Sequence, residues 1–311
     1  MRALVWALAV TLPIVGLTLL LVRPELDVVW EHHPAHFWLV LLTAVLNFGL
    51  GFLLGEAAAR REDARVFLVS VVFLASAGFL ALHALATPGV LLAGKNSGFQ
   101  IASAVGLLLA SGFAAASAVD LDRGGALLLV RRRRIVHAAL LALMGTWAAV
   151  SLTTLPPLEE PIEPEELEGP LTALAALGTA LYAAASVRYA LLFRRRRAPL
   201  LLAIVTAFVL LSEAMFAVAL APSWHASWWE WHLLMLVAFA IVGLAARGEW
   251  GDLLGQVHQF VSGVTHGRND HHHVVPGQPG RDHTLGRGWR STRMRPWANT
   301  RISATRTSTG R

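Results

Sequence analysis

The 311-residue chain contains no cysteine, a single lysine and few charged residues of either sign. Without cysteine there is no disulfide framework, no thiolate metal site and no cysteine nucleophile. Charged residues make up only 15% of the chain, against about 25% in a typical soluble protein. Hydrophobic residues make up 55%. This composition argues against an ordinary soluble protein and indicates one that lies in a membrane.

The apolar residues gather in runs of about 20, the length that crosses a bilayer core as a helix. We expect eight such spans, and they fall at Ala3–Val22, Phe37–Gly55, Val66–Ala86, Phe99–Val119, Ile135–Leu155, Leu171–Phe193, Leu200–Ala221 and Trp229–Ala246. The first run lacks a small-x-small cleavage site, so we interpret it as an uncleaved anchor. The sequence therefore predicts an all-α integral membrane protein, with residues 1–247 as its transmembrane domain.

Arginine gives the expected orientation. With the N-terminus inside, the inner connections hold nearly all the basic residues outside the spans, and the outer connections hold only Arg23 and Lys95. The inner set is Arg2, Arg60, Arg61, Arg65, Arg123, Arg131 to Arg134, Arg194 to Arg197 and Arg247. The positive-inside rule then predicts that both ends of the chain are cytoplasmic and that the protein lies in the cell (plasma) membrane.

The composition changes after the last span. Residues 248–266 carry apolar side chains at helical spacing, which predicts an amphipathic exit helix. Residues 267–311 are rich in Arg, Gly, Thr, Pro and His and are expected to form a disordered tail. The abrupt loss of alanine and leucine also fits translation out of frame, in which case the histidine triplet at 271–273 has no metal-binding meaning.

No motif of a soluble enzyme is present in the sequence. We find no phosphate-binding glycine loop, no nucleophile elbow and no H-E-x-x-H, so we do not expect an enzyme. The net charge of +6 does not indicate nucleic acid, because the arginines lie in short runs between apolar segments. Those runs fit topology determinants and contacts with anionic lipid.

Histidines gather on the predicted outer side. The stretch "WEHHPAHFW" supplies His32, His33 and His36, and other spans and connections add His83, His225 and His232. We expect His36, His83 and His232 to form the core of a metal site, because each lies at the end of a span. His32, His33 and His225 are looser and would contribute around that core. Neutral imidazole suits transition metals such as zinc and copper, and a haem would need one or two axial histidines.

Two other interpretations of these histidines stay open. Histidine and tryptophan both tolerate the headgroup zone, so the cluster can be only a hydrated rim that topology gathers into one layer. The histidines can also sense protons, since the unperturbed pKa of imidazole is about 6.5.

Polar residues within the spans are further candidates. On the second span His36, Thr43, Asn47 and Gly51 share a stripe, which we expect to face the bundle. Glu213 lies in the outer half of the seventh span, and an ionisable group there suggests function by default. We expect Glu213 and Asn47 to form intramembrane polar sites, with Glu213 below the histidines as a partner. A protonated or hydrogen-bonded glutamate that only links helices is the alternative.

Small residues predict the packing faces of two spans, because they let helix backbones approach closely in lipid. In the fourth span the stripe is Ser103, Gly106, Ala110, Ala114 and Ser117. In the sixth span the corresponding stripe is Thr172, Ala176, Thr179, Ala183 and Ser186.

The stretch "LHALATPGVLLAGKNSGFQIASAVGLLLA", residues 82–110, resembles the multi-span N-terminal regions of some actinobacterial membrane-bound adenylate/guanylate cyclases. The similarity covers about residues 25–250 and includes no catalytic motif. It implies a sensory membrane module that a helix joins to a cytoplasmic cyclase domain. The chain departs from that pattern, because residues 251–311 have no place for the metal-binding aspartates of a cyclase.

We therefore expect a multi-pass membrane sensor, the input module of a signalling protein without its own catalytic output. Its partners would be the lipid bilayer and either a cytoplasmic signalling domain or a second copy of the chain in a homodimer. Two alternatives remain: a transporter or channel for a small solute or ion, and a membrane protein that binds a metal or haem through the outer histidines. The near absence of proline and charge in the spans weighs against a transporter.

Overall fold

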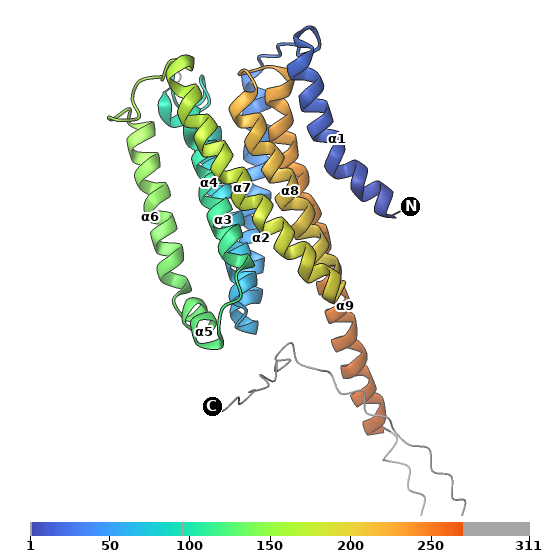
Figure 1. The fold of residues 1–311 in the computed structure, drawn as a ribbon. Helices are drawn as coiled ribbons and strands as arrows, with labels where there is room; N and C mark the ends of the chain where they lie inside the picture. Colours follow the sequence, from blue (N-terminus) through green and yellow to red (C-terminus); the bar gives the residue numbers. More distant parts are fainter. Residues whose placement is uncertain (1, 95, 270–311) are drawn as a thin grey trace, which may run out of the picture. The chain divides into compact units, whose positions relative to one another are not determined.

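The structure is a computed structural model that describes the backbone of residues 2–94 and 96–269, and the side chains of residues 6–94, 96–163 and 165–247. Within these residues the chain is helical and has no strand, which confirms the predicted all-α class (Figure 1). The helices are α1 (Arg2–Val22), the short 3₁₀ helix η1 (Pro24–Leu26), α2 (His33–Arg61), α3 (Ala64–Leu85), α4 (Ser97–Ala118), α5 (Arg123–Arg131), α6 (Arg133–Leu152), α7 (Pro164–Arg196), α8 (Pro199–Leu220) and α9 (Ala226–Asn269).

Seven helices among the described residues are long and apolar enough to cross a membrane: α2, α3, α4, α6, α7, α8 and α9. The remaining predicted span corresponds to α1, whose described part, Trp6–Val22, is a shorter apolar helix. Two details differ from the sequence-based expectation. The short helix α5 precedes α6, and the eighth span continues without a break into the expected exit helix as part of α9. The chain forms two compact units, residues 1–258 and residues 259–311. The predicted tail beyond residue 269 lies outside the described residues.

The turn between α2 and α3 shows how local sequence ends and restarts a span. Helix α2 stops at Glu62, which adopts a left-handed conformation with φ of 52°. Asp63 then caps α3, because its carboxylate accepts hydrogen bonds from the backbone N–H groups of Arg65 and Val66 at 2.9 and 3.1 Å. These two residues satisfy backbone groups that would otherwise lack a partner at the helix ends. Helices α2 and α3 can therefore pack as an antiparallel pair after a very short connection.

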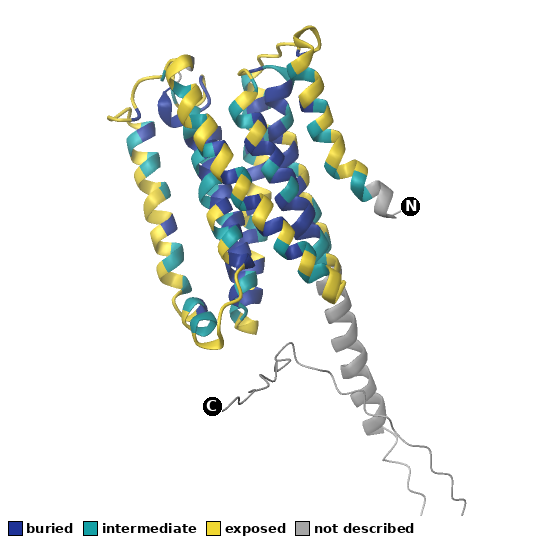
Figure 2. Cartoon of the chain, in the orientation of Figure 1, coloured by how far each residue is buried: buried dark blue, intermediate teal, exposed yellow. Residues whose placement is uncertain are grey.

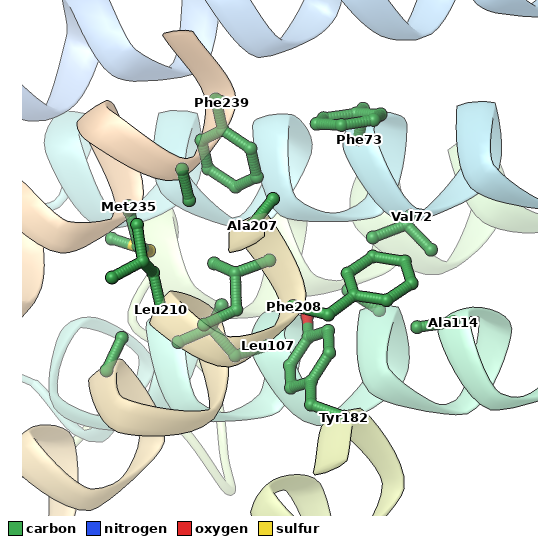
Figure 3. Close-up of a cluster of buried hydrophobic side chains, with 14 of the residues drawn as sticks. Val72, Phe73, Leu107, Ala114, Tyr182, Ala207, Phe208, Leu210, Met235 and Phe239 are labelled. Atoms are coloured by element: carbon green, nitrogen blue, oxygen red, sulfur yellow. The ribbon is translucent and has the colours of Figure 1, made fainter. Parts of the chain in front are cut away.

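Helix α3 lies at the centre of residues 1–258 and packs against both α2 and α4 (Figure 2). Around it lie aromatic rings from distant parts of the sequence (Figure 3). The Phe73 ring of α3 meets Phe239 of α9 at 5.4 Å, and Tyr182 of α7 meets Phe208 of α8 at 5.7 Å between centroids. These contacts join α3, α7, α8 and α9 around one apolar core.

The predicted packing face of the fourth span is correct, and that of the sixth span is correct only in part. All five small residues predicted for α4 are buried. On α7, Ser186 is buried, and Thr179 is half-buried and exchanges hydrogen bonds with Ser212 of α8. However, Thr172, Ala176 and Ala183 are exposed. The buried face of α7 instead carries Ala175, Gly178, Tyr182, Ala185, Ser186 and Tyr189. The two tyrosines explain the difference, because their rings fill the core while an alanine can face lipid at little cost.

An ionic contact joins α3 and α7 near the connection between α4 and α5. Asp120, in the connection between α4 and α5, accepts hydrogen bonds from Arg65 of α3 at 2.7 Å and from Arg188 of α7. Partial desolvation opposes ionisation of this carboxyl, but the hydrogen bonds and charges of the two arginines outweigh it and lower the pKa of Asp120. The carboxylate is largely exposed, so this contact positions α3 and α7 more than it stabilises them.

Candidate metal site at the ends of three helices

The structure brings His36, His83 and His232 together. His36 lies in the first turn of α2, His83 near the end of α3 and His232 in the second turn of α9. All three are buried, and one nitrogen from each ring lies within 4.8 Å of the others. The Nε2 atoms of His36 and His232 are 3.1 Å apart. The three imidazoles therefore form a compact cluster from residues far apart in the sequence.

A backbone carbonyl fixes the second nitrogen of two of the three rings. His83 Nδ1 donates to the backbone oxygen of Phe99 at 2.9 Å, and His232 Nδ1 donates to the backbone oxygen of Trp228 at 3.1 Å. A carbonyl oxygen can only accept, so these two bonds place the proton of each neutral ring on Nδ1. The Nε2 lone pairs of His83 and His232 are then free to act as ligands.

His36 completes the pattern through Thr87. Its Nδ1 lies 3.1 Å from Thr87 Oγ1, and the same hydroxyl donates to the His83 backbone oxygen at 3.4 Å. The threonine hydroxyl can accept a hydrogen bond from His36 Nδ1 in the tautomer that carries the hydrogen there, and in that tautomer the Nε2 atom of His36 is a third ligand. In the other tautomer Thr87 donates to Nδ1, and His36 Nε2–H donates to His232 Nε2. Metal-binding histidines usually donate their other N–H as in the first tautomer, because the bond fixes the tautomer and the ring orientation.

The geometry fits a single metal ion. Three nitrogens bound to one ion at 2.0–2.1 Å in a tetrahedral arrangement lie about 3.3 Å apart. The His36–His232 pair is already near this spacing at 3.1 Å. The Nε2 atom of His83 is buried and has no hydrogen-bond partner, so it is available to the ion. The direct contact between His36 and His232 leaves no room between them for a porphyrin, so the site fits an ion and not a haem held between these two rings.

Aromatic rings shield the cluster from water. His83 stacks on Phe99 with a centroid distance of 4.4 Å, and His232 stacks on Trp231 at 3.5 Å. Trp228 lies 4.9 Å from His36 and 4.4 Å from His232. Trp228 and Trp231 therefore form part of the wall around the three histidines.

The three looser histidines have other partners. His32 caps the start of α2, because its Nδ1 accepts the N–H of Ala35 at 3.0 Å. His33 contacts the Pro88 backbone oxygen and Glu31, each at 3.0 Å. His225 Nδ1 donates to the Asp27 backbone oxygen at 2.9 Å. They position the surrounding connections and do not join the group of three within the described residues.

Asp27 fixes the start of α9, a role that the sequence did not reveal. Its carboxylate accepts hydrogen bonds from the backbone N–H and the hydroxyl of Ser227, both at 2.8 Å. Backbone bonds from Trp30 N to Trp224 O and from Ala226 N to Val28 O join the same two segments. The connection before α2 thus positions the helix that carries His232.

The two intramembrane candidates lie apart from this hydrogen-bond network. Glu213 is buried on α8, and its electrostatic neighbour is Glu230 of α9 and not a histidine. The partners of the histidine Nδ1 atoms are Phe99, Trp228 and Thr87, so Glu213 is not among the groups that hold those nitrogens. Asn47 is fully buried in α2, and neither atom of its amide has a partner in the described residues.

Comparison with known proteins gives no match: no protein-family model, no curated protein and no solved structure matches the chain. The functional argument therefore depends on the site itself.

Proposed function

We propose that this protein is a multi-pass membrane protein that binds a transition-metal ion through His36, His83 and His232 and acts as the input module of a signalling protein. The observation that carries the proposal is the convergence of three buried imidazoles, two with Nδ1 bonded to a backbone carbonyl and the third with Nδ1 beside the Thr87 hydroxyl. Such an arrangement holds the ligand atoms in place before the ion arrives.

The donor set indicates the class of metal. Three imidazole nitrogens without thiolate or carboxylate favour zinc or copper over calcium or magnesium, which prefer oxygen ligands. The described residues supply three protein ligands, which leaves a fourth position for water or a small ligand. The metal would supply Lewis acidity or a redox centre there, and the protein residues would orient it and exclude bulk water.

Helix α9 supports a signalling role. It carries His232 in its second turn and is 44 residues long, about twice the length needed to cross a bilayer. A change at the histidine end of this helix can therefore be carried along it within residues 226–258. In this proposal α9 would act on a cytoplasmic signalling domain or within a homodimer.

This proposal includes a plasma-membrane location with the histidine end outside. A reporter fused after Arg134 or Arg197 should be cytoplasmic, and one placed in residues 159–168 should be external. The reason is the concentration of arginine on one side of the predicted topology. Protease or labelling access in whole cells checks the result, and a cytoplasmic signal from residues 159–168 would contradict the orientation.

Metal binding is tested on full-length protein in detergent, with His271, His272 and His273 changed to serine in every sample. Metal content and isothermal titration with zinc and copper should show one tight site. The double variant His36→Ala, His83→Ala should lose affinity by roughly 100-fold or more, since removing ligands should exceed the 10–100-fold cost of removing a supporting partner.

His137→Ala is the matched control, because His137 lies on α6 outside the cluster. It should bind metal as the parent protein does. Equal, weak binding by the parent and the double variant would refute the site and leave the histidines as a hydrated rim. Transport of zinc or copper into liposomes by the parent protein would support a transporter and contradict the signalling role.

A further inference from the structure

A second site lies between α2, α3 and α6, away from the histidine cluster. A cavity of about 400 Å³ opens there. It is lined by Phe48, Gly51, Phe52, Gly55, Glu56, Leu74, Gly78, Arg133, Arg134, His137, Leu140, Leu141 and Met144. Most of this lining is apolar, and the charged residues are few.

The basic charges come from the start of α6. Arg133 and Arg134 are the first two residues of that helix, and His137 follows one turn later. The Nε2 atom of His137 is buried and has no hydrogen-bond partner, and its electrostatic neighbours are Arg133 and Glu56. The positive end of the α6 dipole adds to the two guanidinium charges. One end of the cavity therefore favours an anion, even with Glu56 on its wall.

Helix α6 does not close the cavity, because little of it is buried. Leu140 and Ser151 are the buried residues of α6, and Figure 2 shows most of the remaining helix as exposed or intermediate. The helix touches α3 at Gly78, where an added Cβ would lie 1.7 Å from Met144 Sδ. Phe48, Phe52 and Leu141, which line the cavity, remain more than half exposed. An apolar chain with an anionic end would cover these side chains and meet the basic residues together.

We infer that this cavity binds an anionic glycerophospholipid, with its phosphate at Arg133 and Arg134 and an acyl chain along Phe48, Phe52 and Leu141. Arginine binds phosphate oxygens through paired N–H donors, and His137 can donate from Nε2 in the neutral tautomer that carries the hydrogen there. The start of a spanning helix is also the depth at which lipid headgroups lie. The bound lipid would fill the space between α6 and the α2–α3 pair.

The test compares three full-length proteins in detergent: the parent, the variant Arg133→Gln, Arg134→Gln and the control variant Arg131→Gln, Arg132→Gln. The control removes the same charge from the same junction, but its residues do not line the cavity. Each protein receives phosphatidylglycerol, phosphatidylcholine or inorganic phosphate. Thermal unfolding and native mass spectrometry then report stabilisation and bound lipid.

Phosphatidylglycerol should raise the melting temperature of the parent and the control by about 3 °C or more, with one retained lipid per chain. The Arg133→Gln, Arg134→Gln variant should lose both effects, and phosphatidylcholine and phosphate should give neither. Equal stabilisation of all three proteins would refute the site, as would equal loss in the control. An effect of inorganic phosphate as large as that of the lipid would refute the role of the acyl chain.

Discussion

Two of the buried polar side chains of helix α2, His36 and Asn47, lie three turns apart, and they differ in every contact they make. His36 has both ring nitrogens engaged, one with Thr87 and one with His232. Asn47 has no partner for either amide atom in the part of the chain that the structure describes. Both belong to the stripe that the sequence predicted to face the bundle, and both are buried. A shared stripe therefore does not give residues a shared function.

The difference teaches what makes a polar cluster a site. Around His36 the neighbouring helices supply hydrogen-bond partners, aromatic rings and two further imidazoles, so one nitrogen from each of three rings comes close together. Around Asn47 the burial costs about 1–3 kcal/mol for each unpaired polar group, and no converging ligand atoms offset it. The remaining two members of the stripe are Thr43 and Gly51. Thr43 donates to Leu39 O of its own helix at 2.8 Å, and Gly51 lets Leu74 of α3 approach.

The largest effect expected from this comparison comes from Thr87. Changing Thr87→Val keeps the side-chain shape but removes the hydroxyl beside His36 Nδ1, so the ring loses the hydrogen bond that orients it. We expect zinc or copper affinity to fall about 10-fold, as for other partners that orient metal ligands. Isothermal titration measures the change.

Thr43→Val is the matched control for Thr87→Val, because it removes a buried hydroxyl that bonds only within α2. Its metal affinity should equal that of the parent. If both valine variants bind metal as tightly as the parent, the Thr87 hydroxyl does not position His36.

A smaller effect is expected at Asn47. Asn47→Leu replaces an unpaired amide with an apolar group of similar size, so the free energy of unfolding should rise by about 1 kcal/mol. Thermal unfolding in detergent should show a melting temperature higher by about 2–4 °C. Metal affinity should not change, since Asn47 contacts none of the three histidines in the described structure.

A lower melting temperature for Asn47→Leu would contradict the contrast between an unpaired Asn47 and a paired His36. It would show that the amide has a stabilising partner, such as a buried water molecule, and that the middle of α2 is a polar site of its own. A loss of metal affinity in the same variant would show that Asn47 and His36 belong to one site.

The histidine cluster could be predicted from the sequence because position along a span gives depth. His36, His83 and His232 each lie at the end of an apolar run, so a consistent topology brings all three to one layer. Thr87 and Asp27 could not be predicted in the same way. Their importance depends on hydrogen bonds across 51 and 200 residues of sequence, and no local pattern marks those distances.

The limits of the sequence are clearest for α4 and α6. Both have a mean hydropathy of 1.8 over their most apolar window, yet 56% of that window is buried in α4 and 11% in α6. Apolar composition by itself determined which segments form long helices, because only a helix satisfies its backbone in lipid. Tertiary structure alone decided which helices face the core and which face outward, since lipid is as apolar as a protein interior and hydrophobicity cannot distinguish the two.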